Sequence, residues 1–397
     1  MGSFMSNRTF GPSTHAVWAG ESDRNNTAHA TQVPIVLSAS FGYADLDEWL
    51  EVATGKRPGY NYSRNTNPTV AVLEEKTRIL EGGEAATSFA SGMAAVSSTL
   101  FGLLKPGDRV VTVKDTYGGT TRLFIEFLPR WGVTVRQVDT VDHDAIEREI
   151  RAGCTLLYLE TPTNPTLKVL DIERLARAGH AAGAIVVVDN TFGTPINTNP
   201  LALGADLVLH SATKFLCGHE DALGGVLTGK AELIKQVYQY REIHGAALGA
   251  DAAYRIIRGM KTLALRVRHQ NASALAIATF LAEHPAVARV FYPGLPEHPG
   301  HEVARKQMRH FGGVLSFELA AGGRDLKRFL GALQVAHCAP SLGAVQTLAG
   351  VPATTSHVEC TAEERVAMGI PESLVRYSVG IEETDDLIAD LSAALGG

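Results

Sequence analysis

Short apolar runs alternate with amphipathic stretches through the middle of the chain. The apolar runs have the length of strands and are almost continuously hydrophobic, which is typical of parallel strands that are buried on both faces. The predicted strands are Ala86–Phe89, Arg109–Val113, Thr134–Val138, Leu156–Glu160, Ile185–Asp189, Leu207–His210 and Gly225–Leu227. The intervening periodicity predicts helices over Gly92–Leu104, Arg122–Trp131 and Ile172–Ala182. This alternation predicts an α/β fold with a mainly parallel sheet.

The pattern changes on both sides of this α/β region. Residues before about Tyr60 are mixed and polar, and we expect an N-terminal arm that packs on something else, a partner subunit included. A helix pattern begins at Pro68 and ends at Gly82-Gly83. We predict three parts: an arm over 1–60, a large domain over 61–257 and a small α+β domain over 258–397.

A long helical stretch runs across the boundary between the predicted large and small domains. This stretch covers Ala252–His284 and stops at Pro285. Mixed strands and helices follow over Val287–Tyr292, Val314–Leu319 and Asp325–Leu333.

Composition narrows the class of protein. The 397 residues carry a formal net charge of -6, so no global basic field would attract nucleic acid or an anionic membrane. No apolar run approaches the ~18 residues of a membrane helix, and no secretory signal is expected. The four cysteines have no zinc or disulfide spacing, which favours a reducing, cytoplasmic compartment. Met1–Ser6 formally matches a myristoylation pattern, but Met5 suits a natural start equally well.

A lysine and an aspartate follow the ends of two predicted strands. Ligands in open α/β sheets bind at such carboxyl ends, and a desolvated Lys214 would be a Schiff-base nucleophile. The hydroxyls of Ser211 and Thr213 beside it suit a phosphate. Asp189 would pair with a protonated pyridine nitrogen. A surface lysine and a turn aspartate are the alternatives, but the two signals together favour pyridoxal phosphate (PLP).

Two further turns follow predicted strands of the same sheet. At Ser91-Gly92, glycine permits close approach of the backbone, and exposed amides at the start of the following helix bind phosphate. Tyr117 lies in a glycine-rich loop, where its ring would stack on a cofactor and its hydroxyl would serve as an acid. A tyrosine that simply packs in the loop is the alternative.

Ordered motifs along the chain carry a resemblance to a known family. They are NYSRNTNPT (61–69), FASGMAA (89–95), DTYGGT (115–120), ETPTNPT (160–166), DNTFGTP (189–195), LGADLVLHSATK (203–214), YPGLPEHPGH (292–301) and LVRYSVGIE (374–382). From about Thr14 to Leu395 the chain resembles the Cys/Met-metabolism PLP enzymes. This group includes cystathionine γ-synthase, cystathionine γ-lyase and methionine γ-lyase. The resemblance implies the PLP-dependent transferase fold of type I.

The resemblance also implies roles for the cofactor-binding residues. Lys214 would hold PLP covalently and move protons, Asp189 would pair with the pyridine nitrogen, and Tyr117 would stack on the ring. The implied phosphate ligands are Ser91, Gly92, Met93, Ser211 and Thr213.

The remaining implied roles concern the substrate and a second subunit. Asn164 would lie near the phenolic oxygen of PLP, and Arg376 would bind the substrate carboxylate with Ser341 nearby. Tyr62 and Arg64 would reach the phosphate of a neighbouring subunit. The resemblance therefore implies a homo-oligomer that acts on a small amino acid, with a catalytic dimer and an expected tetramer.

Two positions depart from parts of the family. Methionine γ-lyases typically carry Cys where this chain has Gly119, and several cystathionine-handling members have Glu where it has Gln346. Both departures favour γ-replacement on an activated homoserine over γ-elimination from methionine or cystathionine. An aminotransferase or a non-catalytic PLP-binding protein is a remote alternative. The catalytic residues alone do not separate replacement from elimination.

Three other features resemble sites but lack what those sites need. Gly224–Ala231 nearly matches a phosphate-binding P-loop, but Ala231 replaces the required Ser or Thr, so we predict a strand and turn. His298 and His301 have no third ligand, so we predict surface histidines and no metal. His210 and His219 flank the lysine segment and receive no role.

Overall fold

The computed structural model describes residues 10–21, 30–320, 325–355, 358 and 361–396. The chain forms two compact units, each built from two separate segments. Unit 1 consists of residues 1–103 and 209–262, and unit 2 of residues 104–208 and 263–397. Met1–Ser6, with its myristoylation pattern, lies outside the described residues. The predicted parts 1–60, 61–257 and 258–397 stay predictions.

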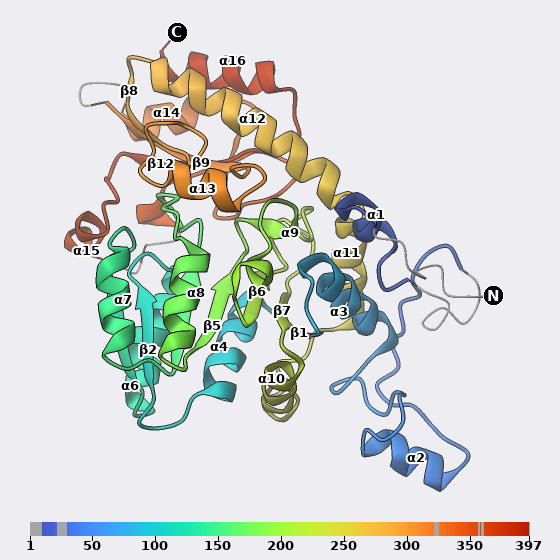
Figure 1. Ribbon diagram of the computed structural model, residues 1–397. Helices are drawn as coiled ribbons and strands as arrows, with labels where there is room; N and C mark the ends of the chain where they lie inside the picture. Colours follow the sequence, from blue (N-terminus) through green and yellow to red (C-terminus); the bar gives the residue numbers. More distant parts are fainter. Residues whose placement is uncertain (1–9, 22–29, 321–324, 356–357, 359–360, 397) are drawn as a thin grey trace. The chain divides into compact units, whose positions relative to one another are not determined.

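The first sheet of unit 2 consists of parallel strands in the order β5-β4-β2-β3. These strands are β2 (Arg109–Val113), β3 (Thr134–Val138), β4 (Leu156–Glu160) and β5 (Ile185–Asp189). Helices α7 (His143–Arg151) and α8 (Ile172–Ala181) pack side by side against it, and their apolar faces share one buried cluster with β2, β4 and β5 (Figure 1). The register places Glu160 opposite Asp189 where the two strands end.

The rest of unit 2 contains a second sheet. Its strands are ordered β10-β11-β12-β9-β8, with every pair antiparallel except β10 and β11. The strands are β8 (Val287–Phe291), β9 (Val314–Leu319), β10 (His337–Cys338), β11 (Leu348–Gly350) and β12 (Leu374–Ser378). The helices are α12 (Leu263–Glu283), α13 (His301–Gln307), α14 (Leu326–Ala332), α15 (Ala362–Ala367) and α16 (Thr384–Leu395). Strand β12 is buried along its whole length and carries Arg376.

Unit 1 combines a short set of strands with helices from both of its segments. Strand β1 (Ala85–Phe89) runs antiparallel to β7 (Gly225–Gly229), which neighbours β6 (Leu207–Ser211); β6 belongs to unit 1 from Leu209 onward. The helices are α1 (Pro12–Trp18), α2 (Leu46–Ala53), α3 (Pro68–Glu81), α4 (Gly92–Leu103), α10 (Ala231–His244) and α11 (Ala250–Met260). Asn67 caps α3 through its side chain, and Gly82 ends that helix in the left-handed conformation that glycine favours.

The N-terminal arm contains one anchored and one exposed helix. The ammonium of Lys76, fully buried in α3, donates to the carbonyls of Ala16 and Val17 and pairs with Glu21, which fixes α1. In contrast, α2 has no buried residue and lies apart from the other helices of unit 1 (Figure 1). Leu46 and Leu50 on α2 are 76% and 62% exposed.

The predicted strands of the α/β region are confirmed within one or two residues at each end. The single helix predicted over Ala252–His284 is wrong, because α11 ends at Met260 and α12 begins at Leu263. The backbone N–H and the hydroxyl of Thr262 both donate to the carbonyl of Gly259. In a continuing α-helix this carbonyl would instead accept the N–H of the residue four positions later. The predicted helix Arg122–Trp131 is a composite of α5 (Gly118–Arg122), a π-helical turn (Leu123–Phe127) and α6 (Leu128–Arg130).

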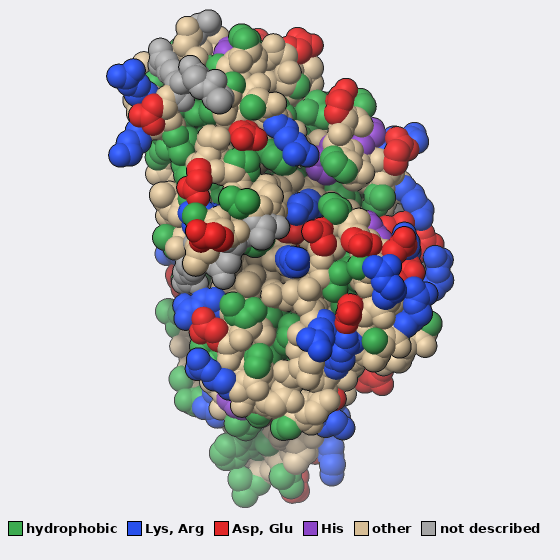
Figure 2. Space-filling model, turned by 90° about the vertical axis from the view of Figure 1, so that its left-hand side faces the viewer, with side chains coloured by type: hydrophobic (Ala, Val, Ile, Leu, Met, Phe, Trp, Pro, Cys, Tyr) green, Lys and Arg blue, Asp and Glu red, His purple; other side chains and the backbone are tan. Residues whose placement is uncertain are grey.

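Charged side chains of both signs lie on the surface. Acidic and basic side chains are interspersed on the face shown in Figure 2, so that face presents no field of a single sign. Within the described ranges, no helix has both the length and the apolar character needed to cross a membrane.

Candidate active site

In unit 1, the predicted lysine lies in a tightly held turn after β6. The backbone N–H of Lys214 donates to the carbonyl of Ser211 at 3.2 Å. Thr213 and Gly224 exchange hydrogen bonds, since the Gly224 N–H donates to the Thr213 hydroxyl at 3.0 Å and the Thr213 N–H donates to the Gly224 carbonyl at 3.3 Å. Ser211, Thr213 and Lys214 are all half-buried. The turn therefore fixes the backbone that carries the amine.

The start of α4 packs directly on the end of β6. The Ser91 hydroxyl accepts the Ala94 N–H at 3.0 Å and so caps the helix, while Met93 is half-buried in its first turn. A Cβ at Gly92 would lie 2.7 Å from the Ser211 Cβ, so only glycine allows this approach. The structure thus brings Ser91, Gly92 and Ser211 together. Helix-start amides beside a serine hydroxyl suit the phosphate of PLP.

The predicted inter-subunit residues lie on the outside of unit 1. Tyr62 and Arg64 are both exposed, and the Arg64 guanidinium lies 5.0 Å from the centre of the Tyr62 ring. Buried Arg241 supports this segment by donating to the carbonyls of Asn65 and Ser88 at 2.5 and 3.0 Å. Sequence reasoning missed Arg241, because an arginine within the polar pattern of α10 gives no signal of burial.

In unit 2, Asp189 lies at the end of β5 with its carboxylate held by three donors. Its Oδ1 accepts the Thr191 N–H at 3.0 Å and the Thr191 hydroxyl at 2.6 Å. Its Oδ2 accepts the Tyr158 hydroxyl at 3.3 Å. Burial raises the pKa of Tyr158, and the negative charge of Asp189 raises it further, so this phenol stays protonated as a donor. The Asp189 carboxylate is therefore oriented and nearly buried, as pairing with a ring nitrogen requires.

A second buried carboxylate, that of Glu160, lies opposite Asp189 and was missed. Its Oε2 accepts the Tyr117 N–H at 2.8 Å, and its Oε1 accepts the Asn164 N–H at 3.3 Å. Tyr117 itself is 45% exposed. Glu160 thereby joins the backbones of two predicted site residues. The available signal was an acidic residue that ends a fully apolar strand.

Arg376 is a buried cation of unit 2. It is 4% exposed, and its guanidinium donates to Asn164 Oδ1 at 3.1 Å and to the Ser341 carbonyl at 2.9 Å. Burial lowers the pKa of Arg376 to about 10, with an opposing effect of Tyr117, so the side chain remains charged at neutral pH. No carboxylate within the described ranges pairs with it. The structure brings Asn164, Ser341 and Arg376 together around a charge that suits an anionic ligand.

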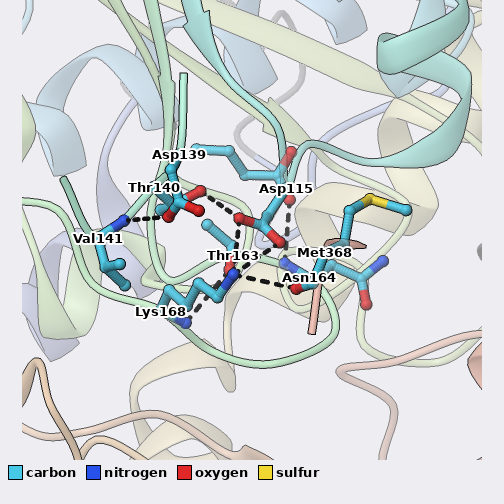
Figure 3. A network of polar contacts seen from close by, with 9 residues as sticks. Asp115, Asp139, Thr140, Val141, Thr163, Asn164, Lys168 and Met368 are labelled. Carbon is cyan, nitrogen blue, oxygen red and sulfur yellow. Dashed lines mark hydrogen bonds and ion pairs between the residues drawn. The ribbon is translucent and has the colours of Figure 1, made fainter. Parts of the chain in front are cut away.

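An ion-pair network supports the loop that carries Tyr117. Asp115 is buried and accepts from the Lys168 ammonium at 3.0 and 3.1 Å, and from the hydroxyl of Thr140 (Figure 3). The same ammonium donates to the Met368 carbonyl at 3.1 Å. Lys168 thus ties the DTYGGT loop to the chain just after α15.

The structure also shows the P-loop-like segment and the histidines that were discussed in the sequence analysis. Gly225–Gly229 is strand β7, as predicted, and α10 follows it directly. His298 is only 9% exposed, so its prediction as a surface histidine is wrong. Its Nδ1 accepts the Gly300 N–H at 3.0 Å within the proline- and glycine-rich loop, which turns the ring inward. Across the described part of the chain, no three His, Cys, Asp or Glu side chains gather as metal ligands would.

Comparison with known proteins identifies the family. The model of the Cys/Met metabolism PLP-dependent enzymes matches residues 13–396. The chain belongs to this family. It is therefore a PLP-dependent enzyme, which confirms the predicted cofactor and the transferase fold of type I.

Relatives with different activities match this family member equally well. It is 42% identical to an L-methionine γ-lyase of Fusobacterium nucleatum, over 98% of the chain and 99% of the relative. It is also 42% identical to a cystathionine γ-synthase of Mycobacterium bovis, over 97% of each. The crystal structure of a cystathionine γ-lyase from Lactobacillus plantarum superposes with a TM-score of 0.91 at 38% identity, over 97% of the chain and 98% of that protein. These relatives establish the family, and they support a synthase and a lyase equally.

Proposed function

We propose that the enzyme catalyses γ-replacement on an O-acyl-homoserine, with a thiol or another nucleophile as second substrate. The observation that carries an amino-acid substrate is the buried charge of Arg376, whose hydrogen-bond partners among the described residues are neutral oxygens and which suits an α-carboxylate. Gly119 and Gln346 favour replacement, because methionine γ-lyases typically have Cys at the first position and several cystathionine-handling members of the family have Glu at the second.

Each side chain of the proposed site has a defined task. When bound, PLP supplies the electron sink that makes the α-proton of an amino acid acidic. Lys214 holds the cofactor and, once released, takes the α-proton on its ε-amine. The Asp189 carboxylate keeps the pyridine nitrogen protonated. Tyr117 stacks on the ring and donates a proton to the departing γ-group, while Arg376 fixes the substrate carboxylate.

The proposed cofactor ligands divide into three groups. Ser91, Gly92, Met93, Ser211 and Thr213 hold the phosphate; Asn164 lies near the phenolic oxygen; Tyr62 and Arg64 serve the phosphate of a neighbouring subunit. Tyr62 and Arg64 are exposed in unit 1, and so are Leu46 and Leu50 of α2. This exposure supports a catalytic dimer and a tetramer built from two dimers.

We also propose a cytoplasmic location. Cys154 and Cys217 are buried free thiols, and Cys338 is an exposed one. Free thiols persist in a reducing compartment.

The second candidate function is γ-elimination to 2-oxobutyrate and ammonia. The 42% identity to a methionine γ-lyase over nearly the whole chain supports it as strongly as other relatives support the synthase. Replacement and elimination use the same residues up to the point at which the γ-group has left, so the difference lies in what the site then admits.

Product analysis separates the two candidates. The PLP-loaded enzyme is mixed with O-acetyl- and O-succinyl-homoserine, with and without cysteine, and with methionine and cystathionine in parallel. We expect a replacement product, cystathionine or another adduct, to form and 2-oxobutyrate to fall when the nucleophile is added. Release of 2-oxobutyrate from methionine or cystathionine whatever nucleophile is present would instead establish a γ-lyase.

A further inference from the structure

We propose that Glu160 is a positioning residue that sets Tyr117 relative to Arg376. This inference rests on the proposed roles of Tyr117 and Arg376. Glu160 ends β4, where every residue is buried, and its side chain is 4% exposed. Its two carboxylate oxygens each accept one backbone N–H from a different loop, the loop of Tyr117 and the loop of Asn164.

The contacts form a continuous path across the candidate substrate site. Oε2 of Glu160 holds the Tyr117 N–H at 2.8 Å, and Oε1 holds the Asn164 N–H at 3.3 Å. Asn164 then accepts from Arg376 at 3.1 Å through its side-chain oxygen. A shift of the Glu160 side chain therefore moves the ring-stacking residue and the carboxylate-binding residue together.

Glu160 occupies a position that is unfavourable for a carboxylate, which indicates that its hydrogen bonds are needed. It faces Asp189 in the strand register, so two carboxylates share a buried edge of the sheet. Burial raises the pKa of Glu160, and the charge of Asp189 raises it further. An apolar residue would satisfy the core without this repulsion. What an apolar residue cannot do is accept two backbone N–H groups from separate loops.

The same two loops have a second connection that does not use Glu160. Asp115, two residues before Tyr117, pairs with Lys168, four residues after Asn164 (Figure 3). This ion pair keeps the loops joined when Glu160 is altered. Loss of Glu160 is therefore expected to shift Tyr117 and Arg376 by a fraction of an ångström rather than unfold the region.

The test measures whether the effect of a Glu160 substitution on ligand binding depends on the presence of Arg376. Four proteins form the cycle: wild type, Glu160→Gln, Arg376→Lys and the double variant, each loaded with PLP. The readout is the apparent Kd of alanine, which has an α-carboxylate but no γ-group, followed by the visible absorption of the cofactor. Asp390→Asn, alone and with Arg376→Lys, is the matched control, because Asp390 is also a buried carboxylate that accepts backbone N–H groups, from Gln334, Val335 and Ala336.

We expect Glu160→Gln to weaken alanine binding roughly 10-fold in the wild-type background, because one of the two N–H groups loses its acceptor. In the Arg376→Lys background the same substitution is expected to cost less than about 3-fold, which is the signature of residues that act through one another. Asp390→Asn is expected to have the same small effect, about 2-fold or less, in both backgrounds. Glu160→Asp, whose shorter side chain reaches only one loop, gives the same comparison if the Gln variant does not fold.

Equal effects of Glu160→Gln in both backgrounds would overturn the inference, as would coupling of the same size at Asp390. Because alanine cannot undergo γ-chemistry, the outcome is independent of the reaction that the enzyme catalyses. Failure to turn over any O-acyl-homoserine, with the coupling intact, would refute the proposed function and leave the role of Glu160 standing.

Discussion

At the scale of single residues, the clearest indication of function is a buried charge whose partners are all neutral. The guanidinium of Arg376 is charged and buried, yet its partners Asn164 and Ser341 offer only neutral oxygens. Charges in protein interiors are ordinarily paired, and the missing partner of a cation is an anion. The α-carboxylate of an amino acid has the planar, two-oxygen geometry that a guanidinium fork prefers.

Removal of the Arg376 fork is expected to act on substrate binding. Arg376→Lys keeps the charge but loses bidentate geometry, so we expect kcat/KM to fall about 10²-fold, mainly through KM. Steady-state kinetics with O-acyl-homoserine measure this, with exposed Arg305→Ala on α13 as the control. An unchanged KM in Arg376→Lys would exclude the assigned role.

His298 is expected to make the protein sensitive to mild acid. Burial, and secondarily the charge of Arg289, lowers the pKa of His298 to about 4, against an ordinary 6.5. Between these values the unfolded chain binds a proton that the folded protein does not. The stability that depends on neutral His298 is therefore complete above pH 6.5 and is lost as the pH falls towards 4, to the extent of about 3 kcal/mol.

Urea unfolding at several pH values between 4 and 7 tests this. His298→Gln keeps a hydrogen-bond acceptor but does not titrate in that range, so its free energy of unfolding should depend less steeply on pH than that of the wild type. His310→Gln, at an exposed position, is the control. Parallel curves for wild type and His298→Gln would contradict the expectation.

Elements were predictable where a local pattern decides them. Most of the strands from β1 to β7 are short apolar runs, which is the pattern of strands that are buried on both faces, so the limits of these strands follow the limits of the runs. The break between α11 and α12 was not predictable, because the helical pattern continues through Lys261 and Thr262 and the helix end depends on contacts of Thr262 with Gly259. Burial of His298 and Arg241 was likewise hidden, since a polar residue in sequence gives no sign of the partners that folding brings to it.

Gly259 of α11 packs closely against the segment after Lys214, and Gly331 of α14 provides a comparison without such packing. An added Cβ at Gly259 would overlap the carbonyl oxygen of Cys217, three residues after Lys214. We expect Gly259→Ala to lower the free energy of unfolding by about 1–3 kcal/mol and to weaken PLP retention. Gly331 in α14 has open space around that position, so Gly331→Ala should be neutral or stabilising by up to about 1 kcal/mol. Thermal unfolding and cofactor absorbance measure both, and equal effects would show that the close approach is unimportant.

At the scale of the whole molecule, the exposed side chains of the arm support the proposed assembly. Leu37, Leu46 and Leu50 are 77%, 76% and 62% exposed, which is an unusual concentration of large apolar side chains for a surface in water. The proposed dimer gives that surface a partner. It also gives the exposed Tyr62 and Arg64 a phosphate to bind.

Mixing two inactive variants tests whether sites are shared between subunits. Arg64→Ala and Lys214→Ala are each expected to lack activity. Random reassociation places one intact site in each mixed dimer, so about one quarter of the wild-type activity should return. Asp189→Ala mixed with Lys214→Ala is the control, because the proposed function assigns both residues to the part of the site that a single subunit supplies. Recovery in the control, or none in the test, would refute sharing.

The anchor of α1 has a consequence for synthesis on the ribosome. Glu21 pairs with Lys76 at 3.1 Å and with Lys261 at 2.6 Å, so one carboxylate joins the first helix to a residue made 240 positions later. Unit 1 is interrupted by residues 104–208, which belong to unit 2. A nascent chain that has reached residue 208 therefore holds the arm and α3 but none of β7, α10 and α11. Domains usually fold in the order in which they emerge. Because residues 209–262 emerge only after all of residues 104–208, we expect unit 1 to complete its fold late, with its apolar arm exposed until then.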